Sequence, residues 1–121
     1  MNVRITLTAL LLGSSIACGS SSPPAPSPTT SGSSVAASIV VGASTMTTTA
    51  YAPNPIAVSV GGTVTWTNND STTHTSTADA GAWNSGSILP GGRFSMTFPS
   101  AGTFPYHCSI HPGMVGTVNV Q

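Results

Sequence analysis

Apolar side chains alternate with small or polar ones along much of the chain after residue 35, as they do in strands that are buried on one face. The alternation runs over 56–60 and again over 63–67, and Gly61 and Gly62 separate the two runs. Two alternating runs joined by a Gly-Gly turn predict a hairpin with one buried face. Further short strands are predicted at 39–41, 46–51, 75–78, 93–98, 102–108 and 115–120.

No window has a helical period of comparable strength, and the 10 prolines and 13 glycines interrupt the segments in which a helix could begin. We therefore predict an all-β fold, in the form of a β-sandwich, over residues 35–121. A domain of this length buries only about 60 to 65% of its unfolded surface. A metal ion that binds the native state alone would stabilise so small a core.

The first 34 residues have the composition of an export signal and a spacer. Residues 1–17 are expected to be a signal peptide, because Arg4 precedes an apolar segment too short to span a bilayer and small residues flank Ile16. Cys18 follows directly and resembles the lipidated cysteine of bacterial lipoproteins, although Ser15 stands where that motif usually has leucine. Lipidation, cleavage with secretion, and retention of an uncleaved apolar helix stay open. Residues 18–34, rich in serine and proline, are predicted to be a flexible tether.

Charged residues make up only 3% of the chain, and the formal net charge is zero. The charged side chains belong to Arg4, Asp70, Asp79 and Arg93. Nucleic acid is excluded as a partner, because binding its phosphates requires clustered lysine and arginine. A protein partner would be recognised through shape and apolar contact rather than through long-range electrostatic attraction.

The segment 106–114 places three metal-ligating residue types at intervals of three, in Cys108, His111 and Met114. A thiolate with two imidazoles and a weak axial thioether is the ligand set of electron-transfer copper sites. His74 supplies the second imidazole, because the loop that follows the strand of Trp66 can reach the same pole of a sandwich. We therefore predict one copper ion bound by these four residues. Zinc is disfavoured because it rarely recruits methionine.

Cys108 and His107 each have an alternative interpretation. A disulfide between Cys18 and Cys108 is not expected, because a loosely tethered residue has no enforced geometry for the bond, whereas a metal would occupy the lone thiol. His107 could serve a second, catalytic copper, but His74 and His111 use the other two histidines of the chain. A catalytic copper normally needs several more imidazoles. Unless another subunit supplies them, His107 is expected to point outward from its strand.

The motifs that surround these ligands point to a known family. They are Trp66-Thr67-Asn68-Asn69-Asp70 before His74, Ser85-Gly86, Leu89-Pro90-Gly91-Gly92, and the run from Gly102 through Cys108 to Met114 and Gly116. This arrangement, over 54–120, resembles the cupredoxins of the plastocyanin and pseudoazurin group, with the greatest likeness to the amicyanins. The resemblance implies an eight-stranded Greek-key β-sandwich with a type 1 copper, in which His74, Cys108 and His111 are the strong in-plane ligands and Met114 is the weak axial one.

The same resemblance implies two supporting roles near the copper. Asn69 occupies the loop position that lends backbone hydrogen bonding near the cysteine sulfur. Many relatives have Asn or Ser directly after the first histidine ligand, where it ties the two ligand loops together. This chain has Thr75 there, and its hydroxyl is expected to make a similar bond.

These features predict a one-electron carrier that works outside the cytoplasm, in the periplasm or at the cell surface, and not an enzyme. We expect a monomer that docks with a redox donor and a redox acceptor through an apolar patch around His111, formed by Ile110, Pro112, Gly113, Leu89 and Pro90. Membrane contact is expected only through a lipid on Cys18. The alternative function is copper storage or delivery, although delivery sites favour exposed Met- and His-rich segments and this chain has only four methionines.

Overall fold

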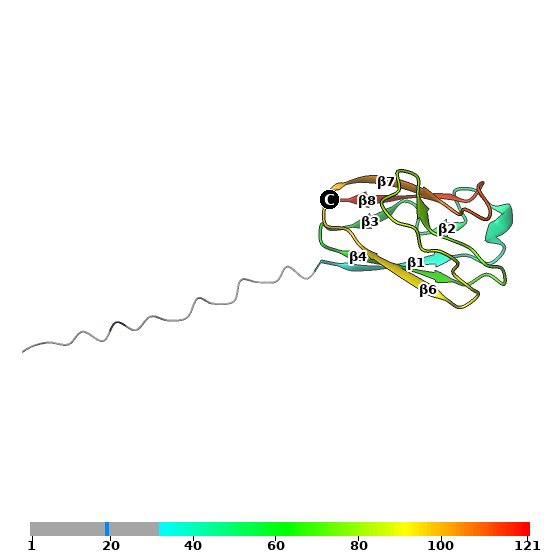
Figure 1. Ribbon diagram of the computed structural model, residues 1–121, viewed down its shortest axis with the longest axis horizontal. Helices are drawn as coiled ribbons and strands as arrows, with labels where there is room; N and C mark the ends of the chain where they lie inside the picture. The colour runs from blue at the N-terminus through cyan, green and yellow to red at the C-terminus, as the bar shows by residue number, and fades with distance from the viewer. Residues whose placement is uncertain (1–18, 20–31) are drawn as a thin grey trace, which may run out of the picture.

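The computed structural model describes Gly19 and residues 32–121, so the predicted signal peptide, Cys18 and most of the tether lie outside the described residues. Residues 32–121 form a sandwich of two four-stranded sheets (Figure 1). The strands are β1 (Ser34–Ile39), β2 (Tyr51–Ala52), β3 (Ile56–Val58), β4 (Thr63–Asn68), β5 (Thr77–Ala78), β6 (Arg93–Thr97), β7 (Gly102–His107) and β8 (Val115–Val120). A short 3-10 helix, η1 (Ala43–Thr45), follows β1.

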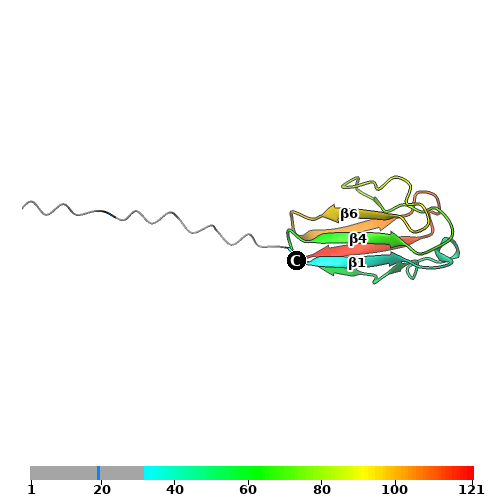
Figure 2. The same cartoon turned by 90° about the horizontal axis from the view of Figure 1, so that it is seen from below.

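One sheet has the strand order β2-β1-β4-β6, and the other has the order β3-β8-β7-β5. Figure 2 shows the first of these sheets facing the viewer, with β1, β4 and β6 side by side. β1 runs parallel to β4 and β3 runs parallel to β8, while the other pairs are antiparallel. From β3 to β7 the chain changes sheet with every strand. The predicted all-β sandwich of about eight strands is confirmed.

The predicted hairpin over 56–67 is wrong. β3 and β4 belong to different sheets, so the turn between them crosses from one layer to the other. Gly61 makes this turn with a φ of 79°, and a Cβ on Gly62 would lie 2.5 Å from the Val58 side chain. The alternation identified the buried positions of both runs except Val60, which is 42% exposed. It could not identify the connection, because a hairpin and a crossover between layers bury the same alternate positions.

The first predicted strands are also wrong in their limits. β1 begins at Ser34 and ends at Ile39, because Gly42 turns the chain with a φ of 76° just beyond it. Small residues hide its alternation, since Ala37 is buried while Ser34 and Ala36 are exposed. The segment predicted as a strand over 46–51 is mostly turn, because its threonines at 47–49 face solvent.

The largest buried side chains between the sheets are aromatic. Trp66, Tyr51 and Tyr106 are fully buried, and the Trp66 and Tyr106 rings meet edge to face. The Trp66 Nε1–H donates to the Tyr106 hydroxyl at 3.2 Å, and the Tyr51 hydroxyl donates to the Thr75 carbonyl at 2.7 Å. Burial raises the pKa of Tyr51 far above its usual range, so Tyr51 stays a neutral donor. The core therefore reaches directly to the residue that follows His74.

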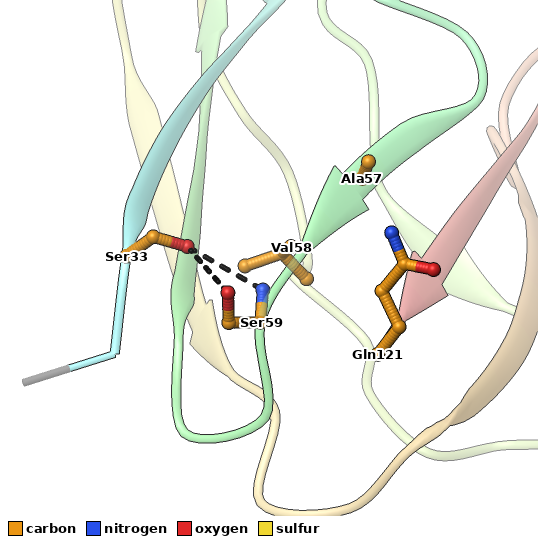
Figure 3. A pocket seen from close by; sticks show the side chains of 5 residues that line it. All are labelled: Ser33, Ala57, Val58, Ser59 and Gln121. Atoms are coloured by element: carbon orange, nitrogen blue, oxygen red, sulfur yellow. Dashed lines mark hydrogen bonds between the residues drawn. The ribbon is translucent and has the colours of Figure 1, made fainter. Parts of the chain in front are cut away.

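The two ends of the sandwich differ in chemistry. Residue 32 and Gln121 lie at one end, and the loop after β7 and the helix η1 lie at the other (Figure 1). Figure 3 shows a small hollow at the first end, lined by Ser33, Ala57, Val58, Ser59 and Gln121. None of these side chains is charged or a strong metal ligand.

Within residues 32–121, no helix is long and apolar enough to cross a membrane.

Candidate metal centre

Cys108 is presented to the interior by the end of strand β7. Alternation along β7 buries Tyr106, leaves His107 half-exposed and buries Cys108 completely. The Cys108 N–H then donates to the Met114 carbonyl at 3.0 Å, and the Met114 N–H donates to the His111 carbonyl at 2.9 Å. These bonds close the loop 108–114 into one compact turn, as its spacing predicted.

His74 lies in the connection between β4 and β5, and its backbone forms an antiparallel β-bridge with Ile88. Its N–H donates to the Ile88 carbonyl at 3.2 Å, and its carbonyl accepts the Ile88 N–H at 2.8 Å. The His74 side chain is fully buried. A ligand distant in sequence is thus delivered to the loop that holds Cys108 without depending on a flexible segment.

Three of the predicted ligands converge. The His74 Nδ1 lies 3.2 Å from the His111 Nδ1, and the Cys108 Sγ lies 3.8 Å from the first and 3.9 Å from the second. A point equidistant from these three atoms would be about 2.1 Å from each, close to metal–nitrogen bonds of about 2.0 Å and metal–thiolate bonds of about 2.3 Å. The three side chains therefore fit a single metal ion.

Met114 is fully buried, as Cys108 is, and its backbone is hydrogen bonded to Cys108 and to His111. A thioether in this position is inside the protein and next to the candidate ligands in the chain. The structure places Met114 in the core. Burial there is expected both of a weak axial ligand and of a residue that only packs. Its coordination stays a prediction.

Thr75 joins the two ligand loops, as its place in the sequence predicted. Its N–H donates to the Cys108 Sγ at 3.3 Å, and its hydroxyl accepts the Ser109 N–H at 2.8 Å. The two bonds connect Thr75, the residue after His74, both to the Cys108 sulfur and to the backbone of the following residue. The role expected for Asn69 is wrong, because its N–H donates to the Ile39 carbonyl instead.

Asp70 is the functional residue that sequence reasoning missed. Its Oδ2 lies 2.8 Å from the His74 Nε2, while its Oδ1 accepts the N–H groups of Gly42 at 3.0 Å and Ser71 at 2.8 Å. The Gly42 N–H, followed by the His74 side chain, holds the pKa of the Asp70 carboxyl well below its usual range. The signal was available, since this is one of only two acidic residues and lies four positions before a candidate ligand.

His107 lies apart from the three converging ligands. Its Nδ1 hydrogen bonds to the Asp79 carboxylate at the protein surface, and its backbone pairs with Thr77 of strand β5. Within the described residues, the cluster of histidine, cysteine and acidic side chains that could hold an ion consists of His74, Cys108 and His111. The structure therefore agrees with an outward-facing His107. The pairing with Asp79 was not predicted.

The surface beside the centre is apolar. His111 is partly exposed, and in the same loop the exposed fraction of Ile110 is 48%. Leu89, directly after the residue that pairs with His74, is 62% exposed. The only side chain of the candidate centre that reaches solvent is thus adjacent to exposed apolar groups.

A small β-sandwich that gathers two imidazoles and a thiolate at one pole defines a class of metal protein with a mixed nitrogen and sulfur centre. Residues 37–121 match the sequence profile of the copper binding proteins of the plastocyanin/azurin family. The chain belongs to this family, and its cofactor is one copper ion. The cupredoxin resemblance that the sequence motifs indicated is confirmed.

Individual relatives agree with this assignment. Amicyanin of Paracoccus denitrificans is 36% identical over 76 residues, which are 59% of this chain and 58% of that protein. Plastocyanin of Scenedesmus fuscus is 36% identical over 84 residues, which are 59% of this chain and 86% of that protein. The match thus spans well under two thirds of the length of the amicyanin.

Solved structures show the same likeness over more of the chain. A purple cupredoxin from Nitrosopumilus maritimus has a TM-score of 0.67 and 35% identity, over 72% of this chain and 99% of that one. The reduced Cu(I) form of an amicyanin mutant has a TM-score of 0.62 and 31% identity, over 73% of this chain and 82% of that one.

Proposed function

We propose that this protein is a one-electron carrier with a type 1 copper, in which His74, Cys108 and His111 are the strong ligands and Met114 is the weak axial one. The observation that carries the proposal is the triangle of two Nδ1 atoms and one Sγ, with sides of 3.2, 3.8 and 3.9 Å. Bound copper would supply the couple between Cu(I) and Cu(II). The protein residues hold the ligands, exclude water and provide a surface for partners.

The ligands are held independently of the metal. Hydrogen bonds between Cys108 and Met114, between His74 and Ile88, and between Thr75 and Ser109 hold the segments that carry the proposed ligands. A site whose donors are already in place needs little rearrangement when its charge changes. This rigidity supports rapid electron transfer rather than ligand exchange.

We propose that partners dock over His111. Its ring is the part of the centre that reaches the surface. The proposed apolar patch consists of exposed residues in the same loop, Ile110, Pro112 and Gly113, and of Leu89 and Pro90, which directly follow the residue that pairs with His74. A chain with a formal net charge of zero has little long-range attraction to offer, so close apolar contact must bring the redox donor and acceptor together. The protein then acts as a monomer that meets its partners briefly and is not itself an enzyme.

The proposed location is outside the cytoplasm, either in the periplasm or at the cell surface. The sequence of residues 1–17 supports export, and Cys18 supports a lipid anchor. Residue 32 joins the sandwich at the end opposite the loop of His111 (Figure 1). With an anchor at Cys18, the tether would enter the sandwich at the end opposite the apolar patch and would leave that patch free for soluble partners.

Copper storage or delivery is the second candidate function. It would require that copper leave readily, but Cys108 and His74 are fully buried and lie in segments closed by backbone bonds. The burial of these two ligands favours retention of the metal. The two functions therefore differ in a property that can be measured directly.

Electron self-exchange of the copper-loaded protein tests the proposal. In mixtures of the Cu(I) and Cu(II) forms, NMR lines of the reduced protein should broaden in proportion to the oxidised fraction. A Cu(I) chelator should remove little copper over the same period. Pro112→Glu should slow the exchange about tenfold or more, because two like charges would meet at the contact, without altering the copper spectrum. Rapid loss of Cu(I) to the chelator with no exchange broadening would support delivery instead.

A further inference from the structure

Next to His74, the proposed copper centre is surrounded by further polar contacts, and most of them are made by Asp70. We propose that Asp70 is a positioning residue for the copper: it fixes the ring of His74 and lowers the reduction potential of the bound ion. This inference rests on the proposed function. It concerns a residue that makes no contact with the metal itself.

The carboxylate of Asp70 is enclosed and fully used. Its side chain is only 4% exposed. Oδ1 accepts the backbone N–H groups of Gly42 and Ser71, and Oδ2 accepts the Thr72 hydroxyl at 3.0 Å in addition to its contact with His74. An ionised carboxylate can only accept hydrogen bonds. It is the form that four surrounding donors stabilise.

The contact with Asp70 therefore decides which nitrogen of His74 carries the proton. The Thr72 hydroxyl, whose oxygen is 2.9 Å from the His74 Nε2, donates its proton to the Asp70 Oδ2. Because Oδ2 is an acceptor 2.8 Å from Nε2, Nε2 must be an N–H donor. The lone pair is then on Nδ1, which is the atom that faces the Cys108 sulfur at 3.8 Å. Without this partner, the ring could adopt the tautomer that presents an N–H to the metal position.

Asp70 also prevents the ring from turning. Gly42, which lies just after β1, donates its N–H to the Asp70 carboxylate, and the backbone N–H of Asp70 donates to the Asn68 side chain at 2.9 Å, so both the side chain and the backbone of Asp70 are held in place. Asn68 in turn donates to the Ile88 carbonyl at 2.9 Å, beside the backbone of His74. A ligand that is hydrogen bonded to an anchored carboxylate keeps one orientation in both oxidation states.

The charge of Asp70 should act on the copper through the imidazole. A carboxylate that accepts the ring N–H makes the ligand a stronger donor, which stabilises Cu(II) relative to Cu(I). The negative charge is enclosed by protein, so water screens it little. Asp79 is the only other acidic residue in the chain, and it is 52% exposed. The carboxylate next to His74 thus dominates the local field.

The chain offers a matched pair of variants for the test. Asp70→Asn and Asp79→Asn each remove one negative charge from an aspartate that hydrogen bonds to a histidine, but His107, the partner of Asp79, lies outside the copper triangle. The measurement is the reduction potential of each copper-loaded protein by voltammetry. Asp70→Asn should lower the ratio of the Cu(II) affinity to the Cu(I) affinity about tenfold. This change corresponds to a rise of about 59 mV in the reduction potential of a one-electron couple. Asp79→Asn should leave the potential near the wild-type value, and equal shifts in the two variants would overturn the inference.

A second measurement uses the metal-free protein and does not depend on copper. ¹⁵N NMR of the wild type should show His74 as a single tautomer protonated at Nε2, and Asp70→Asn should give a mixture, because an amide can also donate. A wild-type His74 protonated at Nδ1 would overturn the inference even if the variant failed to fold. If instead the copper-loaded wild type lacks a type 1 spectrum while His74 is protonated at Nε2, the proposed function fails and the positioning by Asp70 stands.

Discussion

Cys108 differs from an ordinary buried cysteine in the number of groups directed at its sulfur. The sulfur accepts the Thr75 N–H at 3.3 Å, and the Nδ1 atoms of His74 and His111 both lie within 3.9 Å of it. Packing alone would surround a thiol with apolar atoms and leave it inert. The polar surroundings of Cys108 are therefore those of a ligand.

The role of Met114 is the one that the geometry constrains least. The reduction potential of the copper-loaded protein tests it. Met114→Leu should keep the type 1 spectrum and raise the potential, because removing a weak donor to Cu(II) favours Cu(I). Met114→Gln should lower the potential, because an oxygen donor favours Cu(II). Voltammetry of the three proteins checks this, and equal potentials would show that Met114 is only a packing residue.

The spacing in the sequence indicated the candidate ligands but not the residue that supports His74, and the reason is physical. Cys108, His111 and Met114 lie within one short loop, so their spacing alone indicates a common metal. Asp70 acts on His74 through a fold that also brings Gly42 to the same carboxylate, 28 positions away in the chain. The contact with Gly42 has no local pattern, whereas the position of Asp70 four residues before His74 is visible in the sequence. The role of Thr75 was predicted from the family resemblance, because many relatives have a hydrogen-bonding residue directly after the first histidine ligand.

Strands β7 and β8 hold the ligand loop from both sides, and their pairing depends on one glycine. Gly116 is opposite Tyr106, and a Cβ on it would lie 2.4 Å from the Tyr106 ring. Gly116→Ala should therefore lower the free energy of unfolding by about 1 to 3 kcal/mol, as overpacking does. Gly113→Ala is the control, because nothing lies within 4 Å of its Cβ position. Urea unfolding of the two metal-free variants measures the difference, and equal stabilities would contradict the close packing.

The elements that the sequence predicted well are those with strongly alternating side chains. β7 and β8 were predicted within a residue of their observed ends. β1 was largely missed because its alternation is between alanine and serine, which differ little in hydrophobicity. The prediction of a hairpin between β3 and β4 was wrong because alternation identifies the buried face of a strand and not the sheet to which the strand belongs. The pairing of β3 with β8 is a contact between distant segments.

At the scale of the whole molecule, the near absence of charge predicts how copies of the protein meet. The self-exchange rate should change little between low and high salt, because the net charge is zero and few charges need screening. In Pro112→Glu the rate should rise with salt, since ions would screen the repulsion between the introduced carboxylates. NMR line broadening over a series of salt concentrations measures both rates. A steep salt dependence in the wild type would show that charged groups, rather than the apolar patch, control docking.

The central claim is that Cys108 and two histidines bind copper in a type 1 site, and the visible and EPR spectra of the Cu(II)-loaded protein test it most directly. A thiolate bound to Cu(II) gives intense charge-transfer absorption and a narrow copper hyperfine splitting, and no other residue in residues 32–121 can supply the thiolate. We expect an intensely coloured wild type and the loss of both signals in Cys108→Ser. A weakly coloured wild type with the broad hyperfine splitting of an ordinary tetragonal Cu(II) complex would contradict the claim.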